Sequence, residues 1–330
     1  MPVRQSIELV GKALHDKTLS PKTLAFKMVV QCRRAVQLAT AEAITSGRRD
    51  GVDTPGLEWY LVYMWLMFLY AAEEDASRLD FFVDVLVAVR SRYNEDTEWI
   101  FRGQPFDWSN LDDQWPCWGL AIAEVMHTTA CYIPDADNSE VRSHALQHRP
   151  GALRRRRRLH LSVRCETGPI LAGDPPPDTP EGRGWARGRA RWLNRHMFHA
   201  RLWALGIYAD PDWAMMTVAG HLESLALPED VWRSKPDDVI VPRELDMEAG
   251  MIWLRVAGAR MFMCRKVWGR DSKIDPGRSR GTWKGVAGYH PDRWAHWKDI
   301  LRALVEGEKG EWRPNVMEAA KVSIASLRCV

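Results

Sequence analysis

The chain has 330 residues, of which 46% are hydrophobic, and a formal net charge of +3. This composition indicates a globular protein of one or two domains, and the charge is too small to require a polyanionic partner for the chain as a whole. The charge is unevenly spread, because residues 142–201 contain 14 arginines and four acidic residues. This segment therefore carries +10 and the rest of the chain about −7.

The cysteines and the hydropathy pattern bear on the compartment. Six cysteines are scattered without a Cys-x-x-Cys pair, which argues against a zinc ribbon or a redox dithiol. The first residues lack the apolar run of a secretory signal. The longest apolar stretch, residues 59–72, is shorter than the roughly 20 residues that cross a bilayer. We therefore expect reduced thiols, no membrane span, and a location in the cytosol or the nucleus.

The first third of the chain predicts a series of helices. Ser20 and Pro21 are typical of a helix start, and apolar residues then recur at helical spacing until Gly47. Residues 59–72 predict a central buried helix. A third helix follows the capping residues Asp75 or Ser77, and its apolar face comprises Leu79, Phe82, Val83, Leu86 and Val89.

Two less regular segments follow. Residues 94–116 predict a loop rich in aromatic side chains, and residues 111–127 a helix interrupted near Pro116. Residues 134–190 contain five consecutive arginines (154–158) and a proline- and glycine-rich run without periodicity, which predicts a long disordered excursion. One alternative is a basic arm that binds nucleic acid or an anionic membrane. Another is a translated intron, and uninterrupted reads of the mature transcript across codons 142–190 would contradict it.

Helical periodicity returns after the excursion. Helices are predicted from Trp192 to about Gly206, from Pro211 onward, over residues 246–267, and over residues 291–305 and 314–327. The third of these is rich in alanine and glycine, which predicts a buried core helix with a close neighbour. No stretch alternates with period two for long enough to predict a sheet.

Several blocks resemble a known family. They are YMWLMFLYAAEEDASRLDFFVDVLVAVRSR, LNRHMFHARLWALGI with MTVAGHLE, MEAGMIWLRVAGARMFMC, and GTWKGVAGYHPDRWAHWKDIL. Together they resemble the fungal proteins grouped as domain of unknown function 3632. The resemblance implies a filamentous-fungal origin, a helical fold and no catalytic residues to carry over. It also implies a conceivable accessory role in specialised metabolism.

The block from Gly281 to Leu304 is the strongest candidate for a site. Trp294 and Trp297 share a helical face with leucines, as packing alone predicts. We interpret the block as a joint that packs the last helices against the helix at 251–267. The ligand-binding candidates are Trp253, Trp283, Trp294 and Trp297, and the acid/base and anchoring candidates for an enzyme are Glu223, Lys284, Tyr289 and His290.

Other motifs carry little chemistry. His196 and His199 stand three apart without a further ligand at a conventional offset, so we expect no metal. Asp112 and Asp113 lack the third carboxylate of a magnesium diphosphate site. Glu223 is expected to form a salt bridge with Arg201 or Arg255. No phosphate-loop, nucleophile-elbow or dinucleotide motif is present, so we expect no cofactor.

These observations predict an all-α protein: an irregular array of about eight to ten helices in two lobes, residues 1–133 and 191–330, with the basic excursion 134–190 between them. The favoured function is an intracellular binding or accessory protein whose aromatic cleft holds a hydrophobic small molecule or a partner protein. The alternatives are a metal-independent enzyme of the isomerase or cyclase type acting on a hydrophobic metabolite, and a nucleic-acid adaptor. Nucleic acid is the less expected partner.

Overall fold

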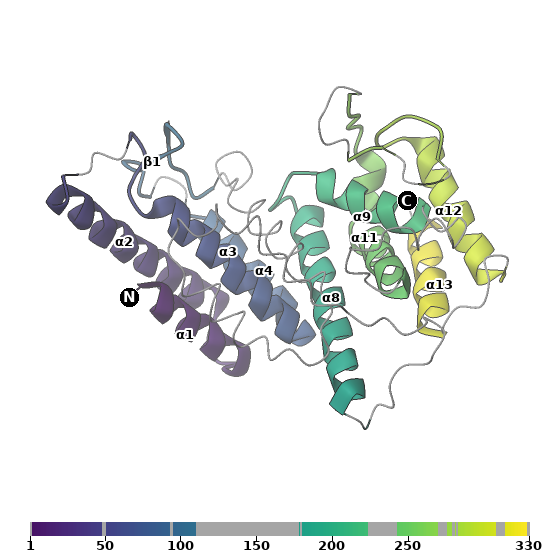
Figure 1. Cartoon of the computed structure of the whole chain (residues 1–330), viewed down its shortest axis with the longest axis horizontal. Helices are drawn as coiled ribbons and strands as arrows, with labels where there is room; N and C mark the ends of the chain where they lie inside the picture. Colours follow the sequence, from purple (N-terminus) through teal and green to yellow (C-terminus); the bar gives the residue numbers. More distant parts are fainter. Residues whose placement is uncertain are drawn as a thin grey trace. The chain divides into compact units, whose positions relative to one another are not determined.

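The computed structural model describes residues 2–47, 51–92, 95–109, 178, 180–223, 243–269, 276–278, 281, 283–307 and 314–328. They belong to two compact units, residues 1–163 and 164–330 (Figure 1). Nine α-helices and one two-stranded sheet make up the regular structure of the described residues. The predicted all-α fold is confirmed.

The first unit begins with two helices, α1 (Pro2–His15) and α2 (Pro21–Thr45), which pack against each other. The start of α2 is the predicted one, because Ser20 is its N-cap and accepts a hydrogen bond from the backbone N–H of Thr23. The helix α1 is amphipathic and was not among the predicted elements. Its Ser6 is buried, and the Ser6 hydroxyl lies 2.7 Å from that of Tyr60 in the helix α3 (Leu57–Glu74).

The apolar helix α3 (Leu57–Glu74) is the core of the first unit, as predicted. The Tyr60 hydroxyl donates to the carbonyl of Met28 at 2.8 Å and so fixes α3 against α2. Gly56 allows α3 to approach α2 closely. Its φ is +79°, and a Cβ there would lie 2.6 Å from the Cβ of Ala39.

A short 3₁₀ turn, η1 (Ala76–Arg78), leads from α3 into α4 (Leu79–Arg90). Asp75 caps this turn by accepting from the N–H of Ser77. All five side chains of the predicted apolar face of α4 are buried, and α4 packs on α2. The prediction for this helix is confirmed.

A small hairpin follows, with strands β1 (Ile100–Phe101) and β2 (Gln104–Pro105) paired antiparallel. The turn between them has positive φ at both Arg102 and Gly103, as a two-residue hairpin requires. The sequence predicted only a loop here, because strands of two residues are too short to show alternation. The hairpin region also buries Trp99, Phe101, Phe106 and Trp108.

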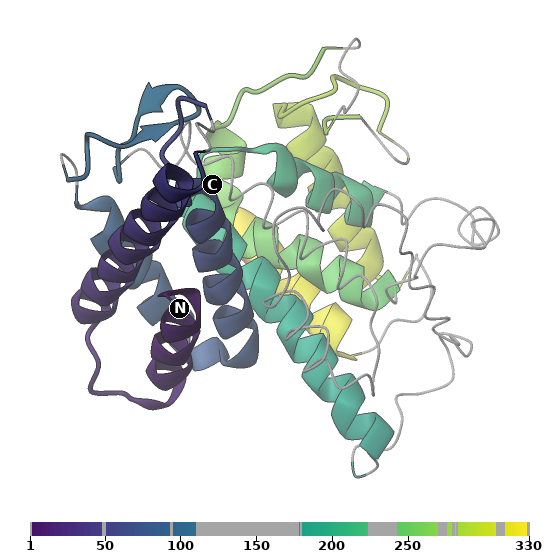
Figure 2. The same ribbon diagram turned by 60° about the vertical axis from the view of Figure 1, so that its left-hand side comes forward.

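The second unit contains α8 (Pro180–Ala204), α9 (Asp212–Leu222), α11 (Arg243–Met263), α12 (Pro291–Val305) and α13 (Pro314–Arg328). The central element is α11, which contacts α8, α9 and α13 (Figures 1 and 2). A Cβ at Gly258 would lie 3.7 Å from Leu327 of α13 and 3.4 Å from the indole of Trp294 in α12, so both helices reach this point of α11. The predicted buried core helix is therefore present.

Two boundaries differ from the predictions. The core helix α11 ends at Met263, whereas the prediction ran to residue 267. The disordered excursion was expected to extend to residue 190, whereas α8 already begins at Pro180. Arg189 provides a physical reason, because it forms an ion pair with the buried Glu248 of α11 and so holds that turn of α8 in place. The rest of the excursion and the helix predicted at 111–127 lie outside the described residues. Within the part of the chain that is described, no helix has the length and apolarity to cross a membrane.

Candidate functional site

The Gly281–Leu304 block contains a buried ion pair. Arg293 of α12 and Glu223, the C-cap of α9, are both fully buried. Two parallel hydrogen bonds join them: Arg293 Nε donates to Glu223 Oε1 at 2.6 Å, and Nη2 donates to Oε2 at 3.0 Å. This bidentate geometry is the strongest form of an arginine–carboxylate contact.

The remaining polar groups of this pair are also occupied. Arg293 Nη1 donates to the carbonyls of Gly277 and Gly288, and Trp297 Nε1 donates to Glu223 Oε1 at 2.9 Å. Glu223 was expected to pair with Arg201 or Arg255; its partner is Arg293, 70 positions away in the chain. A carboxylate held by three donors is a structural anchor and is poorly placed to accept a proton from a substrate.

Tyr289 is a second anchor of the same region. Its hydroxyl donates to the carbonyl of Pro211 at 2.8 Å, and its ring is stacked on Trp203 with centroids 6.2 Å apart. Burial raises the pKa of Tyr289 well above its ordinary value. The neighbouring indole of Trp268 donates to Asp212 at 3.0 Å. The segment before α12 is thus fastened to the start of α9.

The other two acid/base candidates lie at the surface. His290 is the N-cap of α12, and its Nδ1 accepts from the N–H of Asp292 at 3.2 Å. Lys284 is exposed. Because Tyr289 points into the core and His290 caps a helix in contact with solvent, the structure does not bring these candidates together around a common ligand position.

Three of the four candidate tryptophans belong to the same joint. Trp294 packs on Phe262 of α11 with ring centroids 5.6 Å apart and on Trp297 at 5.9 Å. The indole of Trp283 donates to the carbonyl of Val286. These are packing contacts within the joint. The fourth tryptophan, Trp253, belongs to a different group of side chains.

The second group surrounds His196 in α8, and we call its rings the His196 cluster: Trp192, His196, His199, Tyr208, Trp213 and Trp253. Trp253 Nε1 donates to His196 Nδ1 at 3.1 Å. Since Nδ1 is the acceptor, the proton of the neutral imidazole is on Nε2. Burial, with the nearby His221 and Arg195 charges, lowers the pKa of His196 well below its ordinary value, so the ring stays neutral.

His199 contributes a buried, neutral imidazole ring to the same cluster. It lies 5.0 Å from Trp253 and 5.1 Å from Tyr208, measured between ring centroids. Burial lowers the pKa of His199 to about 3. The described residues contain no group of three or more histidine, cysteine, aspartate or glutamate side chains placed to hold a metal ion.

Three buried ring nitrogens of the cluster have no hydrogen-bond partner among the described residues: His196 Nε2, Trp192 Nε1 and His199 Nε2. The first two are donors, on residues that are 2% and 8% exposed. Their rings are adjacent, with centroids 4.7 Å apart. A buried donor left without an acceptor costs about 1–3 kcal/mol, and such donors are uncommon in folded proteins. Each of these donors would be satisfied by an oxygen acceptor.

A histidine and a carboxylate lie near this cluster. His221 Nδ1 of α9 is 3.6 Å from Asp246 Oδ2 of α11, and both side chains are about one-quarter exposed. Burial raises the pKa of Asp246 well above its ordinary value. His221 is close enough to His196 for the charge of one to disfavour that of the other. Sequence reasoning missed both residues, because no motif links positions 221 and 246.

The fold and these contacts define an all-α protein whose second unit has a polar, aromatic interior. Residues 65–301 match the family described as protein of unknown function (DUF3632). The chain belongs to this family, as the resemblance of its tryptophan- and glycine-rich blocks predicted. No match was found among curated proteins or among solved structures.

Proposed function

We propose that the protein is an intracellular binding or accessory protein that holds a hydrophobic small molecule at the His196 cluster. The observation that carries the proposal is the pair of adjacent buried donors, Trp192 Nε1 and His196 Nε2, with no acceptor among the described residues. A ligand with a carbonyl or carboxylate oxygen would complete them. This position replaces the cleft expected around Trp283, Trp294 and Trp297 and keeps Trp253.

The surroundings favour an apolar ligand body. The cluster consists of aromatic rings and two imidazoles whose pKa values are lowered by burial. Binding sites of this kind combine apolar walls with a few placed polar groups that fix the orientation of the ligand. The donor pair would supply orientation, and the half-buried ring of Trp213 would supply contact area.

The intracellular setting and the metabolic role are part of the same proposal. Both cysteines in the described residues, Cys32 and Cys264, are free thiols, as is usual for proteins of a reducing compartment. An accessory role in fungal specialised metabolism, suggested by the family resemblance, would supply hydrophobic metabolites that carry oxygen.

The test compares native and denatured masses of the protein expressed in a filamentous fungus. Wild type should carry a discrete extra mass that disappears on denaturation. Trp192→Phe and His196→Leu remove one donor each and should lose that mass. Trp294→Phe is the matched control, since it removes another buried indole N–H without an acceptor among the described residues, outside the cluster. Bare wild-type protein, or a mass kept by both cluster variants, would contradict the proposal.

A second candidate function is a metal-independent isomerase, favoured by the His221–Asp246 pair, whose histidine lies close enough to His196 to lower its pKa. In this account the donor pair holds a carbonyl oxygen, and His221 moves a proton from the neighbouring carbon to another carbon of the same molecule. His221→Gln should then keep the bound mass but accumulate unconverted ligand. An identical ligand population in wild type and His221→Gln would leave binding as the function and remove the isomerase.

A further inference from the structure

The N-terminal half of α8 presents arginines on one face. The helix contains six arginines and a single acidic residue, Glu181. Arg183, Arg187 and Arg191 are four positions apart, so each lies about 6 Å along the axis from the next on the same side. Arg183 and Arg187 are exposed, and Arg191 is half-buried.

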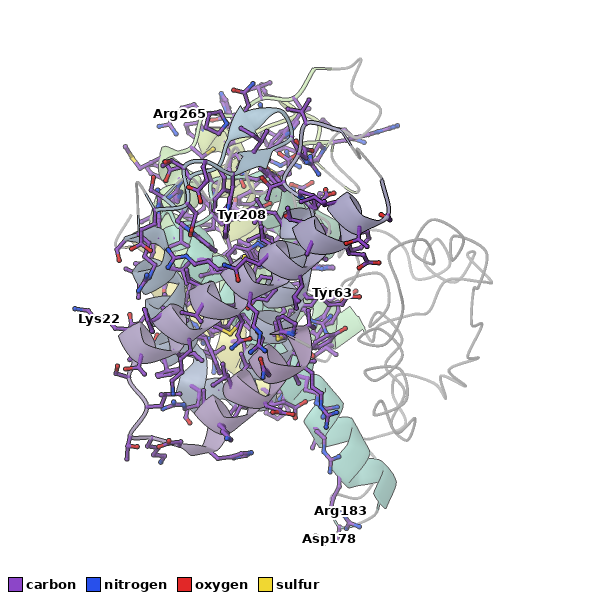
Figure 3. The ribbon with its side chains drawn as sticks, turned by 90° about the vertical axis from the view of Figure 1, so that its left-hand side faces the viewer. Lys22, Tyr63, Asp178, Arg183, Tyr208 and Arg265 are labelled. Carbon is purple, nitrogen blue, oxygen red and sulfur yellow. The ribbon has the colours of Figure 1, made fainter. Side chains whose placement is uncertain are left out.

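Two further arginines of α8 contact neighbouring side chains. Arg189 is paired with Glu248 of α11, and Arg195 is buried over the ring of Trp192. These contacts fix the rotation of α8 about its axis, so the Arg183–Arg187–Arg191 face has a defined direction. The N-terminal end of α8 extends past the ends of α11 and α13, and Arg183 lies near its tip (Figures 1–3).

We propose that the Arg183–Arg187–Arg191 face binds the phosphate backbone of a nucleic acid. Guanidinium groups match phosphate oxygens in charge and geometry, and a regular row of them matches a regular polyanion. Five consecutive arginines, 154–158, precede this helix in the sequence.

The composition of the face favours nucleic acid over other anionic partners. Between the arginines of residues 183–190 the chain has glycine, alanine and one tryptophan, and no leucine, isoleucine, valine, methionine or phenylalanine. A helix that lies on a membrane needs a broad apolar face, and a protein interface needs apolar or aromatic anchors around its charges. A phosphate backbone needs neither.

The test measures fluorescence anisotropy of a labelled oligo(dT) of about 20 nucleotides with the full chain. Each lost phosphate contact lowers the salt slope by about 0.7 for single strands. Between about 50 and 200 mM salt, wild-type affinity should therefore fall about 7-fold more than that of Arg183→Gln/Arg187→Gln. Arg255→Gln/Arg278→Gln, which removes two exposed charges elsewhere in the unit, should behave as wild type.

Circular dichroism should show equal helix content in all these proteins, since glutamine is nearly as good a helix former as arginine. Equal affinities and salt slopes for wild type and Arg183→Gln/Arg187→Gln would overturn the proposal. So would arginine-dependent binding to vesicles of phosphatidylserine and phosphatidylcholine with no binding to the oligonucleotide, because the partner would then be a membrane.

Discussion

Replacing Glu223 by glutamine tests the role of the buried ion pair. The change removes one charge and leaves Arg293 fully buried among neutral acceptors: the amide oxygen of the new side chain and the carbonyls of Gly277 and Gly288. Breaking a fully buried pair from one side costs about 3–5 kcal/mol. For a unit of this size, that corresponds to a fall in melting temperature of about 6–20 °C.

The assay is urea unfolding followed by tryptophan fluorescence, with the transition of the second unit assigned by hydrogen exchange. Arg293→Met should cost a similar amount. The double variant should cost less than the sum of the two, because whichever charge goes first leaves the other unpaired. The control is Arg302→Gln, which breaks the exposed pair with Asp299 and should cost about 0–1 kcal/mol.

A loss below about 1 kcal/mol in Glu223→Gln, or additive effects in the double variant, would contradict this role of the ion pair. Either result would mean that water reaches the pair and screens its charges. Glu223 would then be accessible, and its candidacy as an acid/base group would return.

Three further perturbations test other parts of the structure. Burial, and then the charge of Asp210, raises the pKa of Asp212 to about 6. The folded state therefore binds an extra proton between about pH 4 and 6, and the protein loses stability as pH rises through that window. Asp212→Asn should flatten the pH dependence of the melting temperature and raise the melting temperature at pH 8, and equal profiles for variant and wild type would contradict this assignment. Gly56→Ala should destabilise the first unit more than Gly103→Ala, because both residues have positive φ but only Gly56 lies against another helix. Equal losses of unfolding free energy in urea would show that backbone strain from the positive φ is the whole effect. His290→Ala should cost about 1 kcal/mol through loss of the cap, His290→Ser should restore the stability, and neither should alter the native mass.

Local signals made several elements predictable. Two helix starts follow from a capping residue before a proline: Ser20 with Pro21, and His290 with Pro291. In the structure Ser20 and His290 are the N-caps of α2 and α12. The apolar faces of the helices also follow from spacing, because a face that must be buried repeats every three or four residues. Signals of this kind act within a few residues, so a single sequence contains them.

Tertiary partners were not predictable in the same way. Glu223 pairs with Arg293 across 70 positions, and His221 meets Asp246 only because α9 packs on α11. The candidate residues of the Gly281–Leu304 block were chosen for their chemical types, whereas their neighbours in the structure are packing partners. The start of α8 was missed because Arg189 gains its partner, Glu248, from another helix.

The central claim is that a ligand binds at the His196 cluster, and NMR tests it most directly. The measured quantities are the chemical shifts of the Trp192 Nε1–H and His196 Nε2–H protons, in the protein as isolated and after the bound ligand has been removed. We expect His196 to stay a neutral Nε2–H tautomer in both samples. Both N–H resonances should have the downfield shift of a hydrogen bond only while the ligand is present. If both groups are already hydrogen-bonded after removal, the acceptor belongs to the protein itself, and the ligand site proposed at the His196 cluster is wrong.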